Sequence, residues 1–246
     1  TPEAAAQRER QAAEWVIRSG GSVVLVGSFN KRTKLEDLPE AAFQISVVNL
    51  NGAKIGLKDL VKLNGLPEVW DLNLSSQSLT DADLGLLQDL PKLEWLNLSY
   101  TRVSDQGIRN LARFPNLKKL EMAGVDFEWE PSLVSVIVAN HPKMEHFGIR
   151  TAKLQPHDFR PLQRLPKLTT LTLVGPVSDE SLRTIAQVKT LVTLEFQENT
   201  LLTDRGLATI AELPILNGLK LGADKSSNLS GNMLRIIVDS APQLQE

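Results

Sequence analysis

The chain has 246 residues, no cysteine and a formal net charge of −2. The lack of cysteine excludes disulfide cross-links, cysteine zinc sites and thiol catalysis. The small net charge gives no electrostatic attraction to nucleic acid or to an anionic membrane surface. Since no apolar run approaches the roughly 18 residues of a membrane span, we expect no membrane insertion and no nucleic-acid partner.

The chain starts at Thr1 rather than at a methionine, and no signal-peptide pattern follows. We therefore expect a fragment of a longer protein or a processed form. The absence of both cysteine and a signal peptide favours a cytoplasmic location.

A helix is the first expected element, over residues 1–19. Thr1 supplies a hydroxyl cap and Pro2 fits the first turn, where a missing N–H is tolerated. The pair Gly20-Gly21 is typical of a helix end.

The segment Ser22–Val26 then has the composition of a strand. Val24 lies 24 residues before Val48, which is the spacing of the units that follow. We therefore expect this strand to be parallel to the later ones. Residues 1–42 are predicted to be an N-terminal capping helix with a degenerate first repeat, because the end of a repeat array must be sealed.

Residues 68–115 consist of two consecutive segments of 24 residues. When the two segments are aligned, their apolar positions coincide. In the second segment, Leu96 and its neighbours Trp95 and Asn97 point alternately to the two faces expected of a strand, which predicts a short strand here. Ile108 and Leu111 recur at a three-residue interval and predict a short helix, which Ser104-Asp105 would start. A fixed period of this size indicates stacked repeats.

Repeat units of this kind start at eight places: Phe43, Glu68, Lys92, Asn116, Lys143, Lys167, Leu191 and Ile215. Because strand, helix and strand alternate, we expect parallel strands joined by right-handed crossovers. Residues 43–246 are predicted to form a single continuous solenoid of about eight repeats. Gln243-Leu244 would start another strand with no cap after it, so this edge is a possible contact for a partner or a second copy.

The pattern L-x-x-L-x-L, a turn, T/S-D and L-x-x-L-x-x-L-P resembles a leucine-rich repeat. The line Thr203-Asp204-Arg205-Gly206-Leu207, with its counterparts at Thr80 and Ser104, is similar to the subclass with a true helix in each unit. The opening segment 12–23 looks like that of bacterial, planctomycete-like repeat proteins. The resemblance implies an α/β fold, a right-handed leucine-rich repeat solenoid that forms a curved horseshoe segment with a parallel concave sheet and convex helices.

The resemblance also implies a binding module for a protein or peptide partner. In some bacterial proteins of this kind a kinase or other enzymatic domain precedes the array. The alternative function is therefore a regulatory or sensor arm of a larger multidomain enzyme whose catalytic domain lies outside this chain.

Three rows of side chains should face solvent on the concave side, with neighbours in a row about 4.8 Å apart. Trp95, with Tyr100 just past its strand, resembles a binding hot spot, since such anchors are enriched in tryptophan, tyrosine and arginine. Alternatively, Trp95 lies flat over its neighbours and binds nothing. The residues that we expect to bind the ligand are Asp71, Trp95, Asn97, Tyr100, Lys119, Glu121, His146 and Arg150.

Other residues near these strands have expected roles as well. Trp70 should edge into the core rather than join the site. The column Asn49, Asn73 and Asn97 would hydrogen-bond along the sheet, which we favour, or contact a ligand. The outermost row, including Ser75, Ser99 and Val174, should face solvent.

Signatures of enzyme chemistry are missing from the sequence. It contains no nucleophile elbow, phosphate loop or dinucleotide fingerprint. The histidines His141, His146 and His157 do not have metal-ligand spacing on one face. We therefore expect no catalytic residues, no metal and no cofactor.

Overall fold

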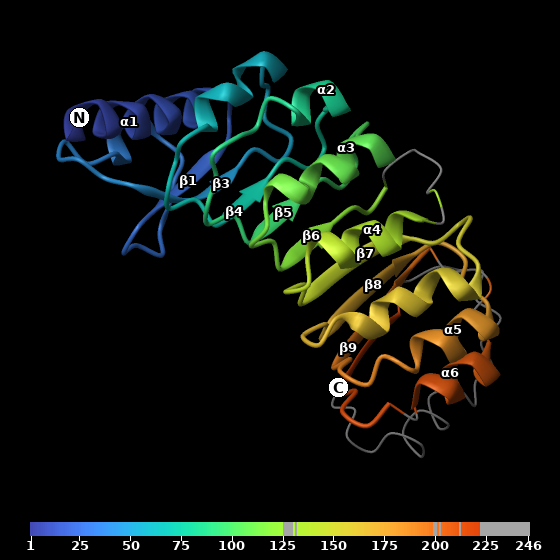
Figure 1. Ribbon diagram of the computed structural model, residues 1–246. Helices are drawn as coiled ribbons and strands as arrows, with labels where there is room; N and C mark the ends of the chain where they lie inside the picture. The colour runs from blue at the N-terminus through green and yellow to red at the C-terminus, as the bar shows by residue number, and fades with distance from the viewer. Residues whose placement is uncertain (125–129, 131, 199–200, 202, 212, 222–246) are drawn as a thin grey trace. The chain divides into compact units, whose positions relative to one another are not determined.

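The computed structural model describes residues 1–124, 130, 132–198, 201, 203–211 and 213–221 (Figure 1). Its contacts divide the chain into two compact units. The first is built on Thr1–Lys119, and the second starts at Leu120. The predicted edge at Gln243-Leu244 lies outside the described residues, and the single continuous solenoid stays a prediction.

Helix α1 (Pro2–Arg18) opens the first unit and confirms the predicted first helix. The Thr1 hydroxyl accepts a hydrogen bond from the Ala4 N–H at 3.4 Å. The helix ends at Ser19, and Gly20 follows with a φ of 88° that favours glycine. Figure 1 shows α1 beside strand β1 (Ser22–Leu25), and the buried residues of α1 are apolar apart from Glu9.

Strand β1 is antiparallel to both of its neighbours, β2 (Lys31–Arg32) and β3 (Ile45–Asn49). The predicted parallel orientation is therefore wrong, and it is Val23, not Val24, that pairs with Val48. Gly21 permits this arrangement, since a Cβ atom there would lie 2.6 Å from the Asn49 carbonyl oxygen. The chain leaves α1 against the end of β3, so β1 starts where β3 ends and runs the opposite way.

Strands β3, β4 (Asp71–Asn73) and β5 (Trp95–Asn97) are parallel and have the predicted register. Val48, Leu72 and Leu96 lie side by side and are fully buried. Their connections contain η2 (Leu57–Leu63), α2 (Asp81–Leu84), α3 (Asp105–Arg109) and η3 (Asn110–Arg113). In Figure 1, α2 and α3 lie on one face of these strands, so the opposite face is left to present side chains.

The second unit repeats this plan. Its parallel strands are β7 (His146–Arg150), β8 (Thr170–Val174), β9 (Thr193–Gln197) and β10 (Gly218–Leu221). Its helices are α4 (Ser132–Asn140), η4 (Pro156–Arg164), α5 (Asp179–Ile185) and α6 (Asp204–Ala211). The short strand β6 (Lys119–Glu121) contains the boundary between the two units in the sequence, which falls between Lys119 and Leu120. Every predicted repeat start is therefore followed by one strand, as an α/β leucine-rich repeat fold requires.

The expectation of a true helix in every unit is wrong for two connections. Both η2 and η4 are 3₁₀ helices, and η1 (Leu35–Asp37) before the first repeat is another. Gly56 at the start of η2 offers no side-chain cap. Pro161 inside η4 has no N–H to donate, so an α-helical ladder cannot continue through it.

The asparagine column has a structural role, but its amide oxygens bond within their own turns rather than along the sheet as we expected. The amide oxygens of Asn49, Asn73 and Asn97 accept the backbone N–H two residues later, at distances of 2.9, 3.0 and 2.9 Å. Two of those donors, Ser75 and Ser99, are buried. The turns after Asn73 and Asn97 therefore direct Ser75 and Ser99 inward, although Asn51 in the equivalent turn is exposed. Val174 is also buried, so the prediction that Ser75, Ser99 and Val174 face solvent is wrong.

Candidate functional site

Two side chains of adjacent strands stand next to each other on the uncovered face of the first unit. Asp71 on β4 pairs in register with Trp95 on β5, and both are partly buried. Lys119, at the end of this unit, places its ammonium 4.9 Å from the centroid of the Trp95 ring. This distance allows a cation–π contact. The three residues form what we call the tryptophan cluster: Asp71, Trp95 and Lys119.

The polar groups of the tryptophan cluster have unused bonding capacity. The indole N–H of Trp95 is buried and has no acceptor among the described residues. Within the same part of the chain, Asp71 accepts no hydrogen bond and makes no ion pair. A buried polar group without a partner costs about 1–3 kcal/mol, so the cluster bears an energetic cost that a ligand could offset.

Burial also acts on the charge of Asp71. It raises the pKa of this carboxyl to about 6, and the positive charges of Lys119 and Lys31 offset only part of the effect. The carboxyl therefore titrates close to neutral pH, unlike an ordinary surface aspartate.

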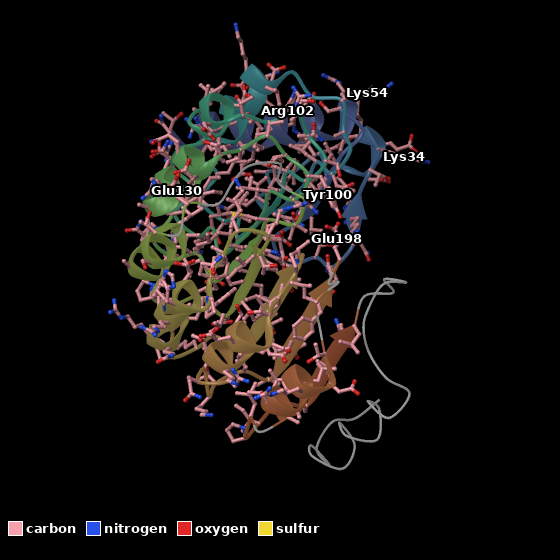
Figure 2. The ribbon with its side chains drawn as sticks, turned by 90° about the vertical axis from the view of Figure 1, so that its right-hand side faces the viewer. Lys34, Lys54, Tyr100, Arg102, Glu130 and Glu198 are labelled. Carbon is pink, nitrogen blue, oxygen red and sulfur yellow. The ribbon has the colours of Figure 1, made fainter. Side chains whose placement is uncertain are left out.

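Asn97 and Tyr100 lie at the exit of β5. The Asn97 amide oxygen is occupied by the Ser99 N–H. Tyr100 is 59% exposed and has a φ of 58°, a left-handed conformation that is uncommon for a residue with a side chain (Figure 2). Of the two, Tyr100 has the more exposed side chain.

The other three predicted residues, Glu121, His146 and Arg150, belong to the second unit. There the ring Nε2 of His146 lies 3.2 Å from the Thr170 hydroxyl. A guanidinium nitrogen of Arg150 lies 3.9 Å from a Glu198 carboxylate oxygen, a long ion pair. The Glu121 carboxylate lies over Gly148, where a Cβ atom would be 2.7 Å from its Oε2. Of the predicted residues, the structure places Asp71, Trp95 and Lys119 side by side, whereas Glu121, His146 and Arg150 each have a different neighbour.

A groove of about 670 Å³ at the other end of the same strands was missed by the sequence reasoning. Trp70 and Phe29 line it with exposed side chains, at 41% and 102%, and Val26 is 50% exposed. The expectation that Trp70 enters the core is wrong because Val69, beside it, already fills that position at 1% exposure. The turn segment Gly27-Ser28-Phe29-Asn30 was the available signal for an exposed aromatic residue.

The described residues hold no group of three histidine, aspartate or glutamate side chains that could bind a metal ion. In the same part of the chain, no helix is long and apolar enough to cross a bilayer.

Comparison with known proteins gives evidence on the fold alone. No family model matches the chain, and no curated protein matches it. Among solved structures, a chain in the crystal structure of the TLR13–ssRNA13 complex is similar, with a TM-score of 0.50 and 17% sequence identity. The similarity covers 74% of this chain and 25% of that chain, so this chain spans about a quarter of the protein it matches. It supports the leucine-rich repeat solenoid.

Proposed function

We propose that the chain is a non-catalytic scaffold that binds a protein or peptide through the concave sheet face of the first unit. The observation that carries this proposal is the tryptophan cluster, where an aromatic ring, a carboxyl and an ammonium stand together with unused hydrogen-bonding groups. Interface hot spots combine a large aromatic anchor with polar groups that pair only in the complex.

The chemistry of the cluster suits a peptide better than a purely apolar ligand. Asp71 can accept from a backbone N–H or a cationic side chain. Lys119 and the Trp95 N–H can donate to a carbonyl or carboxylate oxygen, once Lys119 swings off the ring. The exposed ring of Tyr100 extends this face at the exit of β5. An extended peptide offers backbone donors and acceptors along its length, with a rise of about 3.3 Å per residue.

Glu121, His146 and Arg150 are proposed as further contacts of the same kind on the second unit. Among them, Arg150 makes a long ion pair with Glu198, at 3.9 Å. Such contacts are weak enough to be exchanged for a ligand.

The proposed location is tested with the intact chain. Wild-type protein is used to capture partners from a lysate, and a captured partner is purified so that its Kd is measured directly. We expect Trp95→Ala and Lys119→Ala to weaken binding at least tenfold, because removing a hot-spot anchor costs more than about 1 kcal/mol. The control is Lys58→Ala, an exposed position on η2, which should leave the Kd unchanged. Equal affinity of Trp95→Ala and wild type would refute this location.

Nucleic acid is tested in the same series. The structural neighbour is a complex with single-stranded RNA, so the expectation from net charge that this chain has no nucleic-acid partner lacks support. A labelled single-stranded oligoribonucleotide is titrated by fluorescence anisotropy at two salt concentrations. Tight, salt-dependent binding that Lys119→Ala weakens would replace the peptide proposal with an RNA-binding one.

A further inference from the structure

A separate hollow of about 570 Å³ lies between helix α1 and the coil that precedes β3. Small or apolar side chains form most of its wall, including Ala5, Ala6, Phe43 and Pro67. Glu9 is the one ionisable residue among the described residues that line it. A volume between about 300 and 1,000 Å³ is typical of small-ligand sites.

The carboxylate of Glu9 is buried, with 4% of the residue exposed. Its Oε2 accepts a hydrogen bond from the Ile45 N–H at 2.9 Å. Its Oε1 is buried and has no partner in the described part of the chain. Glu9 thus uses one acceptor oxygen in the fold and leaves the other without a donor.

The electrostatic surroundings of Glu9 favour the arrival of a positive charge. Burial raises the pKa of this carboxyl, and the nearby negative charge of Glu68 raises it further. The Ile45 N–H and the charge of Arg8 act in the opposite direction but do not cancel the effect of burial. A cation beside Oε1 would supply both the missing donor and the missing charge.

The wall of the hollow is held in place without the free oxygen of Glu9. The Arg10 guanidinium lies 5.1 Å from the centroid of the Phe43 ring and donates to the Glu40 carbonyl at 3.1 Å. It also donates to the Pro39 carbonyl. Since these contacts join the coil to α1, and the Ile45 contact needs only Oε2, the Oε1 atom has no evident part in stability.

We propose that this hollow binds a cationic nitrogen, an ammonium or a guanidinium, carried on a short apolar stem. The nitrogen donates to Glu9 Oε1, and the stem packs against Ala6 and Phe43. Because Oε1 is shielded from water in the unliganded chain, the donor must displace part of the wall.

The test titrates the intact chain with n-butylammonium and n-butylguanidinium, followed by NMR chemical shifts. We expect saturable binding, at least tenfold weaker for neutral n-pentanol because it brings no charge. Glu9→Gln keeps an oxygen for the Ile45 N–H but loses the charge, and should weaken cation binding at least tenfold. Glu14→Gln, the same substitution on the same helix, should change the Kd by less than twofold. Absence of saturable binding, or equal Kd values for Glu9→Gln and wild type, would overturn the proposal.

A second variant locates the bound cation. Ala6→Leu fills the hollow and leaves the carboxylate in place, so it should also weaken binding at least tenfold. Unchanged binding by this variant would place the cation elsewhere and would likewise overturn the proposal. Thermal unfolding of each variant shows whether it is folded.

The source of the cation is distinguished by two further probes, N-acetyl-lysine N-methylamide and its arginine counterpart. Tighter binding of these than of the alkyl cations assigns the site to a side chain of a partner, and weaker binding assigns it to a free amine. Trp95→Ala should bind all the probes as wild type does. A negative result for the Glu9 hollow would therefore leave the proposal for the tryptophan cluster unaffected.

Discussion

The carboxylate of Asp81 occupies the space into which a side chain on Gly107 would extend. A Cβ atom at Gly107 would lie 2.3 Å from Asp81 Oδ1 and 2.7 Å from a methyl carbon of Val103. The same carboxylate accepts from the Ser104 N–H at 2.7 Å and from the Ser104 hydroxyl. The acid at the start of one repeat helix therefore binds the start of the next, and the glycine leaves room for it.

The second unit contains the same arrangement. The Thr203 hydroxyl donates to Asp179 Oδ1 at 2.8 Å, and a Cβ at Gly206 would lie 2.6 Å from that oxygen. The T/S-D-x-G sequence motif thus specifies a contact between consecutive repeats as well as the start of a helix. Glycine is needed at its fourth position for space rather than for backbone conformation.

Gly107→Ala tests this contact. Alanine favours helix over glycine by up to about 1 kcal/mol, but the added methyl group would overlap a carboxylate that cannot move without losing its hydrogen bonds. We expect a net loss of about 1–3 kcal/mol in the free energy of unfolding, measured by urea denaturation. The control Gln106→Ala, at an exposed neighbour in the same helix, should stay within about 0.5 kcal/mol of wild type.

A double-mutant cycle identifies the cause. In an Asp81→Ala background the overlap with the carboxylate is absent and only that with Val103 remains, so Gly107→Ala should cost at least about 1 kcal/mol less than in wild type. Strict additivity of the two substitutions would contradict the proposed contact.

The asparagine turns give a second prediction. Asn73 Oδ1 accepts from the Ser75 N–H at 3.0 Å and from the Ser75 hydroxyl at 2.6 Å. Asn73→Ala leaves both buried donors of Ser75 without this acceptor, so we expect a loss of about 1–3 kcal/mol in the free energy of unfolding. Asn30→Ala, at an exposed hairpin position, is the control and should have little effect. Asn73→Asp, which keeps an acceptor oxygen, should recover most of the stability, and failure to do so would argue against the hydrogen bond as the cause.

Tyr100 offers a third prediction, in which stability and affinity change in opposite directions. Its left-handed backbone costs about 1–2 kcal/mol relative to glycine, and the side chain is largely exposed. Tyr100→Gly should therefore unfold at higher urea than Tyr100→Ala, by about 1 kcal/mol, because alanine keeps the Cβ strain. Both variants lose the ring and should bind a partner of the concave face more weakly than wild type. Equal stability of the two variants would show that the backbone is not strained.

The periodic features of the fold were predictable because each has its own sequence signal. Two-residue alternation and the 24-residue period fix the register of β4 and β5, since a slip by one residue would expose Leu72 and Leu96. The orientation of β1 carries no such signal. It is seen only in the pairing of β1 with β3 and in the close approach of Gly21 to the carbonyl of Asn49, which are contacts between segments far apart in the sequence.

The candidate site was predictable only in part. The repeat alignment places Asp71 and Trp95 on adjacent strands, as observed. It cannot show that the Trp95 N–H lacks an acceptor, that Trp70 is kept out of the core by Val69, or that Glu9 has a free oxygen. These properties depend on which neighbours fill the available space and satisfy each polar group, and no periodic pattern encodes that.

Asp71 makes stability depend on pH in a direction opposite to that of most aspartates. Its pKa rises from an ordinary value of 3.8 to about 6 in the folded chain, because burial disfavours the charged form. Below pH 3.8 the carboxyl is protonated in both the folded and unfolded states, and it costs nothing. Between pH 3.8 and 6 the unfolded chain loses this proton first, so stability falls as pH rises, and above pH 6 the cost is complete.

Asp71→Asn removes the titration while keeping a side chain of similar shape. The variant should gain stability relative to wild type at pH 7.5, and that gain should be about 1 kcal/mol larger than at pH 4, once solvent screening at this partly exposed face is allowed for. Urea denaturation of both proteins at the two pH values measures the difference. Glu40→Gln, which removes one charge at an exposed position, controls for net charge. A gain of the same size at both pH values would mean that Asp71 is not desolvated, and the tryptophan cluster would then lack the unpaired carboxyl on which the binding proposal depends.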